Sequence, residues 1–290
     1  AILFDVIFSE PGVPANDRRL AAAVCNAGNV VLPLLREEAA NYSTPDAHML
    51  PLLKCAKGLG HINVEADSDG VVRSLFMREG PPGDTTPQLA WVAYALSGQA
   101  SEMPGEPQQP INPSWHREHA IRIPFIAADT RFPTVSYASV IRGEVDPERL
   151  RGRLILVGAT ASGMGDRFVT PLSSTVGTTA GVEIQANVLN GLLQGRSIVD
   201  LPGAVSALMA TAWVALLLGL LLYRPRYALW MTLGCMATAL LGAWVLLRQG
   251  HWWSPAACLI GLLLSYLIWN WRRLSVILAY FGWELARLDN

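Results

Sequence analysis

The chain has no surplus of charge, since its 22 Lys and Arg residues and 23 Asp and Glu residues leave a net charge of −1. It also has no Lys/Arg-rich run and no RNA-binding signature. Proteins that bind nucleic acid neutralise phosphates with clustered cations, so we expect no nucleic-acid partner.

Catalytic and metal-binding motifs are missing as well. The sequence contains no GxSxG elbow, no HExxH pair and no CxxC pair. Ser9, Ser162, His61 and His116 could act as nucleophile or base, but isolated serine and histidine residues are usually structural. We therefore expect no catalytic residue, no metal and no cofactor in the residues present. An extracytoplasmic, membrane-anchored enzyme is a remote alternative.

The four cysteines lie far apart in the sequence. Cys235 and Cys258 fall inside apolar stretches and are expected to be small buried hydrophobic residues. Cys25 and Cys55 lie in the charged part of the chain, where a disulfide can persist if that part is outside the cytoplasm. The sequence leaves their pairing open, because it does not show whether the two Cβ atoms meet.

Charge is scarcest between residues 203 and 271, where the only charged residues are the loop arginines. The mean hydropathy of the whole chain is +0.30 and 51% of its residues are hydrophobic, which is high for a soluble protein. Three uncharged stretches have about the 20 residues that cross roughly 30 Å of hydrocarbon as a helix. They are Gly203 to Tyr223, Tyr227 to Leu247, and Pro255 to Trp271 extended upstream by His251, Trp252 and Trp253. Buried helices of a soluble bundle would carry polar faces, which these stretches lack.

Basic residues in the short loops predict the orientation of these three spans. Arg224 and Arg226 follow the first span and Arg272 and Arg273 follow the third, whereas only Arg248 lies between the second and third. The positive-inside rule then places the C-terminus in the cytoplasm and residues 1 to 202 outside it. We therefore expect an extracytoplasmic domain at 1 to 202, a three-helix membrane block at 203 to 271 and a cytoplasmic helix at 272 to 290.

The segment after Arg273 has apolar residues at a 4-3-4-3 spacing. They are Leu274, Leu278, Phe281, Leu285 and Leu288. This is the seam of a two-stranded coiled coil and predicts a homodimer. An amphipathic helix on the inner leaflet would show a similar stripe, so both interpretations stay open.

Residues 1 to 202 alternate between short β-rich runs and helical apolar spacing, which predicts an α/β domain with a mostly parallel sheet. The expected strands are ILFDVIF, NVVLPL, GVVRSLFM, IRIPFI and RLILVGA. The expected helices are Asp17 to Ala27, Thr86 to Leu96 and Val182 to Leu193, and the Pro-rich stretch Met103 to Ser114 is an expected loop.

The loop after the RLILVGA strand is the predicted place for a ligand, because ligands of open α/β sheets lie outside the carboxyl ends of the strands. It contains Asp166 and Thr170, and its GATASGMGD run lacks GxGxxG order. Asp5 at the end of the first strand, and Glu183 and Asn187 on the following helix, could converge there. Each could instead be a helix cap or turn anchor, the favoured interpretation for Glu183.

The run DSDG, Asp67 to Gly70, has the alternating oxygens of a calcium loop, but Arg78 stands where an EF-hand needs its bidentate Glu. An Asp-Gly turn is the better explanation. Arg73 could pair with one of these carboxylates or contact a ligand.

Several motifs resemble one known family. FDVIFSEP, VVLP, HINVEADSDGVVRSL, GRLILVGATASGMGDRFVTPLSS and GVEIQANVLNGLL occur in the order found in the type-two CHASE domain, an extracellular sensor associated with cyclases and histidine kinases. The family also places three transmembrane helices after the sensor. The chain departs at its front, where the family has an N-terminal membrane helix and this sequence starts without Met, so we expect an N-terminally truncated sensor domain.

The resemblance implies a bacterial receptor of the inner membrane. Its stimulus would be an unidentified small molecule or protein, and its output a cytoplasmic domain beyond Asn290. A histidine kinase that acts on a response regulator in a two-component system is the favoured output. A nucleotide cyclase, a diguanylate cyclase or a Ser/Thr kinase is the alternative. A transporter would require charges inside the membrane, and none occurs in the spans.

Overall fold

The computed structural model describes residues 1–8, 10–34, 50–99, 102–105, 114–126, 132–161, 163 and 167–288. They form two compact units, Ala1–Val199 and Asp200–Asn290. Each unit has its own cluster of buried hydrophobic residues.

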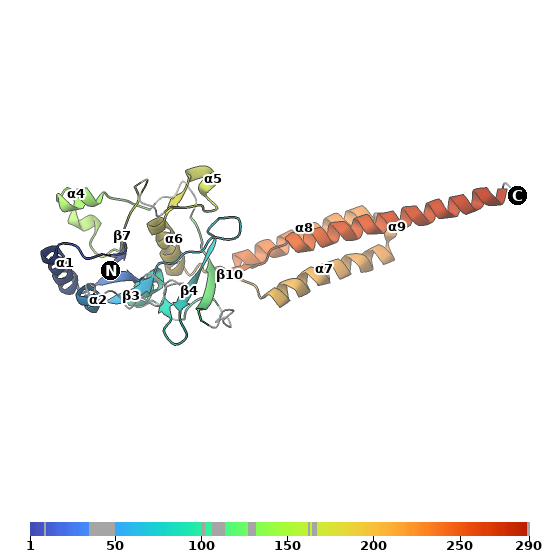
Figure 1. Cartoon of the computed structure of the whole chain (residues 1–290). Helices are drawn as coiled ribbons and strands as arrows, with labels where there is room; N and C mark the ends of the chain where they lie inside the picture. Colours follow the sequence, from blue (N-terminus) through green and yellow to red (C-terminus); the bar gives the residue numbers. More distant parts are fainter. Residues whose placement is uncertain are drawn as a thin grey trace. The chain divides into compact units, whose positions relative to one another are not determined.

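A four-stranded parallel sheet with the order β3-β2-β1-β7 lies in the first unit (Figure 1). Its strands are β1 (Ile2–Asp5), β2 (Val30–Leu34), β3 (Gly58–His61) and β7 (Ile155–Gly158). Ile2 of β1 is in register with both Val30 and Ile155. The expected α/β domain with a parallel sheet is confirmed, although β1 is shorter than the apolar run that predicted it.

The described helices of this unit are α1 (Pro14–Ala27), α2 (Leu50–Cys55), α3 (Leu89–Leu96), α4 (Tyr137–Ile141), α5 (Ser173–Val176) and α6 (Gly181–Leu193), with a 3-10 turn at Pro147–Arg149. Helices α1 and α2 pack on one face of the parallel sheet, and α3 and α6 pack on the other. Neighbouring residues of a strand point to opposite faces. Leu32 therefore packs with α1 and α2, whereas Val31 packs with α3 and α6. A parallel sheet that is buried on both faces explains the nearly continuous apolar runs in the sequence.

A separate three-stranded antiparallel sheet has the order β5-β4-β6. Its strands are β4 (Ser74–Gly80), β5 (Thr86–Pro87) and β6 (His116–Arg122), and a short antiparallel pair joins β8 (Arg167–Phe168) to β9 (Thr179–Ala180). The prediction was wrong in detail here. The strand expected in GVVRSLFM begins at Ser74, and β6 precedes most of the IRIPFI run. Most of β6 is only half-buried, so its sequence HREHAIR carries no apolar run.

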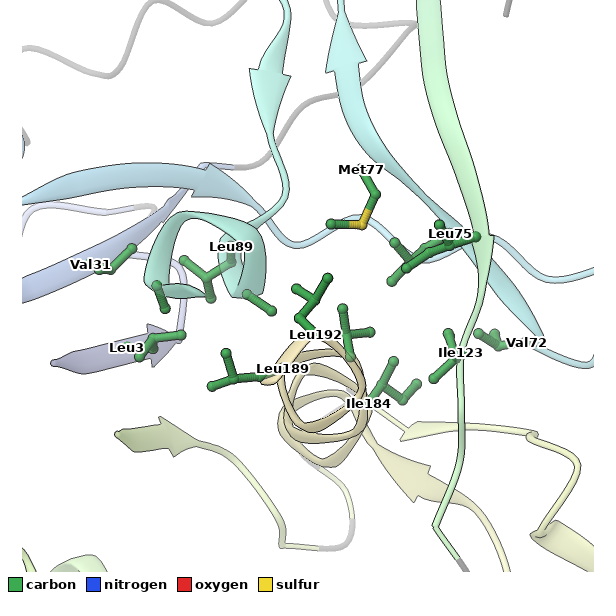
Figure 2. Packing of buried hydrophobic residues seen from close by; sticks show 14 residues of the cluster. Leu3, Val31, Val72, Leu75, Met77, Leu89, Ile123, Ile184, Leu189 and Leu192 are labelled. Atoms are coloured by element: carbon green, nitrogen blue, oxygen red, sulfur yellow. The ribbon is translucent and has the colours of Figure 1, made fainter. Parts of the chain in front are cut away.

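Helix α6 lies between residues of the two sheets (Figure 2). Leu189 of α6 lies toward Leu3 of the parallel sheet, and Ile184 lies toward Ile123 and Val72 on the antiparallel side. One hydrophobic cluster therefore joins the parallel sheet, α3, α6 and the antiparallel sheet.

The second unit contains three long helices. They are α7 (Gly203–Tyr223), α8 (Ala228–Arg248) and α9 (Ala256–Leu288), with a 3-10 turn at Pro225–Tyr227 and a short strand pair of β10 (Val199–Asp200) and β11 (His251–Trp252). Gly261 lets α9 approach α7 closely, because a Cβ there would lie 2.9 Å from Cγ2 of Val214.

Among the described residues, two helices are long and apolar enough to cross a membrane, Gly203–Tyr223 and Pro225–Arg248. The third expected span lies in the first half of α9 and is not one of these two. Helix α9 runs without a break through Arg272 and Arg273 to Leu288, 33 residues in all (Figure 1). Its seam residues Leu274 and Phe281 are more than half exposed. The side chains of Leu285 and Leu288 lie outside the described residues.

A disulfide joins Cys25 of α1 to Cys55 of α2, with the two Cα atoms 4.7 Å apart. It closes a loop of 30 residues that contains β2. The bridge resolves the pairing that the sequence left open, and disulfides persist mainly in extracytoplasmic proteins.

We predict that Cys25→Ser lowers the free energy of unfolding of the first unit by about 3 kcal/mol, because the unfolded chain regains the entropy of the open loop. Chemical unfolding of the oxidised protein measures this loss. Cys55→Ser and the double variant should lower the free energy of unfolding by the same amount as Cys25→Ser. A double variant with an additive loss would contradict the bridge.

Candidate functional site

The carboxyl edge of the parallel sheet is the place where the sequence predicts a ligand. Asp5 ends β1 and is in register with Gly158, which ends β7. The Asp5 side chain is buried, with 6% of the residue exposed. A Cβ on Gly158 would lie 2.5 Å from Cβ of Val182, so the first turn of α6 packs directly on the end of β7. This part of the edge is filled by protein.

The loop after β7 is held by Arg167, a residue that the sequence reasoning did not select. Its Nε donates a hydrogen bond to Thr178 Oγ1 at 2.8 Å, its Nη1 donates to the Thr160 carbonyl at 3.1 Å, and its Nη2 donates to the Thr178 carbonyl. These bonds join the two ends of the loop. Asp166 lies outside the described residues.

Thr170 is buried and hydrogen-bonded within the same loop. Its Oγ1 lies 2.9 Å from Thr179 Oγ1, and its backbone N–H donates to Ser173 Oγ at 2.8 Å. The backbone of Val169 accepts a hydrogen bond from Val72 at 2.8 Å, so the segments of Thr170 and Arg73 lie beside each other. The contacts of Thr170 are those of a loop anchor.

Arg73 is paired within its own turn. Its guanidinium donates to Asp67 at 2.7 Å and to both oxygens of Asp69 at 2.9 and 2.7 Å. These bonds hold the pKa of Asp69 at about 2 and raise the pKa of Arg73. Gly70 has a φ of +78°, as the Asp-Gly turn requires. No group of three or more metal-ligating side chains occurs in the part of the chain that the structure describes.

Asn187 and Glu183 lie one turn apart on α6. Asn187 is 4% exposed, its Oδ1 accepts the N–H of Ile126 at 2.9 Å, and its Nδ2 donates to the Glu183 carbonyl at 2.7 Å. The Glu183 side chain is exposed in the first helical turn, where the helix dipole favours a carboxylate. Asn187 therefore binds the segment after β6 to α6.

We predict that Asn187→Ala costs about 1 kcal/mol of unfolding free energy, because the part-buried N–H of Ile126 loses its acceptor. Thermal or chemical unfolding measures it. Asn190→Ala, one turn later on the same helix, removes only an exposed bond to Gln194 and serves as the control. Equal losses for the two variants would contradict a structural role of Asn187.

Glu79 is a buried acid that the sequence did not single out. It lies at the end of β4, is 5% exposed, and its Oε2 accepts a hydrogen bond from Asn63 Nδ2 at 3.1 Å. Burial raises its pKa, while the Asn63 bond and the charge of Arg117 oppose that rise. Arg117 also pairs with Glu65 at 3.3 Å. Alternation along β4 puts Glu79 on the same face as Leu75 and Met77, which are buried. The sequence alone does not show which face of this strand is covered.

The raised pKa predicts a pH dependence of stability. At a pH below the unfolded-state pKa of Glu79, its carboxyl group is protonated in both the folded and the unfolded protein. Its burial then carries no free-energy cost from a charged carboxylate. As pH rises toward the folded-state pKa, the unfolded state loses its proton first and stability falls. Glu79→Gln should therefore lose less unfolding free energy than the wild type between acidic and neutral pH. Asn63→Ala removes a bond that opposes the rise in the pKa of Glu79, so it should lose more unfolding free energy than the wild type over the same pH range. Identical pH profiles for all three proteins would contradict the assignment.

A buried pair of glutamines joins the start of α3 to α6. Gln88 Oε1 accepts the N–H of Ala90 at 2.6 Å at the start of α3, and Gln88 Nε2 donates to Gln185 of α6. His61, which ends β3, is fully buried. A histidine without exposed surface in this conformation has no access to a substrate.

A cavity of about 360 Å³ lies at the other end of α6. Three consecutive residues after β6 form one side, and the last turns of α6 with Arg196 form the other. The lining residues are Pro124, Phe125, Ile126, Asn190, Gly191, Gln194 and Arg196. Among the described residues that the sequence predicted for a site, Asn187 is joined to this lining by its bond to Ile126.

The CHASE2 domain family matches residues 1–234, so the chain belongs to this family. No curated protein and no solved structure matches the chain. CHASE2 is an extracellular sensor domain of membrane receptors. The matched region includes the whole first unit, α7 and the beginning of α8. The resemblance to a CHASE2 sensor is thereby confirmed.

Proposed function

We propose that the chain receives a stimulus outside the cell and passes it through three membrane-spanning helices to a cytoplasmic output domain. The observation that carries the proposal is the extent of the family match, which joins the α/β unit and the first membrane-length helix in one family domain. The Cys25–Cys55 disulfide supports an extracytoplasmic location of the first unit.

The third crossing is supported by contacts within the second unit. Arg273 Nη1 of α9 donates to the Pro225 carbonyl in the turn between α7 and α8 at 3.2 Å. At the opposite end, the Leu201 N–H donates to the Trp252 carbonyl at 3.0 Å. The part of α9 before Arg273 thus extends alongside α7 over its length, and carries no charged residue from Ala256 to Trp271.

The two ends of the second unit differ in charge as the positive-inside rule requires. Arg224, Arg226, Arg272 and Arg273 belong to the end near Pro225, and Arg248 belongs to the other. Aromatic rings accompany three of these cations: Arg224 lies over Tyr223, Arg226 over Tyr227 and Arg248 over Trp244, at 5.1, 4.7 and 4.7 Å. Such amphipathic pairs favour the headgroup region of a bilayer.

A histidine kinase of a two-component system is the output that we favour, with a nucleotide or diguanylate cyclase as the alternative. The continuous α9 supports a mechanical connection, because a helix that leaves the membrane unbroken transfers rotation or displacement of the span. Its exposed seam of Leu274, Leu278 and Phe281 supports a coiled coil with a second copy of the chain. The phosphoryl acceptor would then be a response regulator.

Labelling of single cysteines tests the topology. In a background with Cys235 and Cys258 replaced by alanine, Glu102→Cys and Gln249→Cys should react with a membrane-impermeant maleimide from outside the cell. Arg226→Cys and Arg287→Cys should react only after permeabilisation. Reaction of Arg287→Cys from outside would show that α9 does not cross.

Deletion tests the sensing role. In the intact receptor, removal of residues 1–199 should change the basal output activity by about fivefold or more, a typical coupling between sites. Output is measured as autophosphorylation or nucleotide product in membrane vesicles. Unchanged output would refute a sensing role, provided that labelling confirms correct insertion of the shortened chain.

A further inference from the structure

The cavity at the C-terminal end of α6 has walls held by the fold. Asn187 Oδ1 binds the Ile126 N–H on one wall, and Gly191 packs so closely on Pro124 that a Cβ there would overlap the proline ring. After α6 ends, the Arg196 N–H donates to the Gly191 carbonyl at 2.8 Å. These contacts connect the backbone segments on the two sides of the cavity.

The lining combines apolar and polar residues. Phe125 and Ile126 are half-buried, and Phe125 packs on the main hydrophobic cluster. Gln194 Nε2 donates to Asn190 Oδ1 at 2.9 Å, which orients both amides. The volume of about 360 Å³ lies at the lower end of the usual range of small-molecule sites, roughly 300–1,000 Å³.

Arg196 supplies the only guanidinium of this lining. Among the residues that the structure describes, its side chain makes no hydrogen bond and no ion pair. By contrast, Arg73 and Arg167 are held by two or more acceptors each. An arginine free to form two parallel bonds recognises a carboxylate, and the apolar surface beside it recognises a hydrocarbon body.

We propose that this cavity binds a small organic carboxylate with an aromatic or branched aliphatic body, whose carboxylate pairs with Arg196 and whose body contacts Phe125. The location connects binding to signalling, and this consequence rests on the proposed function. Arg196 begins the segment that leads to α7, and two residues later the Ile198 carbonyl accepts the Arg122 N–H at 2.7 Å. A bound carboxylate would favour one position of that segment.

Binding of phenylacetate to the full chain in nanodiscs tests the proposal, with calorimetry as the readout. 4-Hydroxybenzoate and isovalerate serve as further carboxylates, phenylacetamide as the neutral analogue and inorganic phosphate as the plain anion. We expect at least one carboxylate to bind, and phenylacetamide and phosphate to bind at least tenfold more weakly than it does. Absence of binding by all three carboxylates, or equal binding of phosphate, would overturn the proposal.

Matched variants locate the site. Arg196→Gln and Phe125→Ala should each weaken carboxylate binding about tenfold or more, in line with the loss of a charge-assisted bond or an apolar contact. Arg149→Gln, at another exposed arginine of the same unit, should leave the affinity for the carboxylate unchanged. Equal weakening by Arg149→Gln would show non-specific binding. If the Phe125→Ala variant does not fold, Arg196→Lys serves as the second variant. A lysine cannot form two parallel bonds to a carboxylate, so unchanged carboxylate affinity in Arg196→Lys would contradict bidentate pairing. Binding without a change of output would refute the signalling consequence and leave the site intact.

Discussion

Helix α6 has nine buried residues among thirteen, too many for a helix that covers one face of a single sheet. It is buried because the parallel sheet and the antiparallel sheet pack on different sides of it (Figure 2). Its apolar residues contribute most of the stabilisation, at about 25 cal/mol for each Å² of apolar surface removed from water. Its polar residues decide the alignment, since Gln185 binds Gln88 and Asn187 binds Ile126. The positions of both sheets depend on this one helix.

The same helix connects the α/β core to the path toward the membrane. Its first turn packs on the end of β7, and its last turn forms one wall of the cavity. The chain then passes through Arg196 to Ile198, which is hydrogen-bonded to β6. A ligand that binds one position of α6 or of this segment more tightly than another shifts the population by that difference in affinity and by no more.

Polar groups in the two units are satisfied in different ways. In the first unit Glu79 is buried and its pKa rises, whereas Asp69 is exposed and bound to Arg73 and its pKa falls to about 2. In the second unit the hydroxyls of Thr211, Thr232 and Ser265 donate to carbonyls four residues earlier, so the helices satisfy these groups internally. Hydrocarbon offers no other partner, which is why apolar helices with internal hydrogen bonds can cross it.

Elements with a local signal could be predicted from the amino-acid sequence. Apolar runs predicted β1, β2 and β7 of the parallel sheet but not β3, whose sequence GLGH carries no such run. Helical spacing predicted α6, and uninterrupted apolar length predicted the helices Gly203–Tyr223 and Pro225–Arg248. The ordered motifs also identified the CHASE2 family. Strand β6 escaped prediction because its residues are mostly half-buried and polar.

The pairing of polar residues that lie far apart in the sequence depends on the fold. Gln88 and Gln185 are 97 positions apart, Asn63 and Glu79 are 16 apart, and Cys25 and Cys55 are 30 apart. No periodicity encodes such pairs. The folded chain also assigned Arg73 and Thr170 to local anchoring and left Arg196 beside a cavity, because burial and the direction of a side chain depend on packing between distant segments.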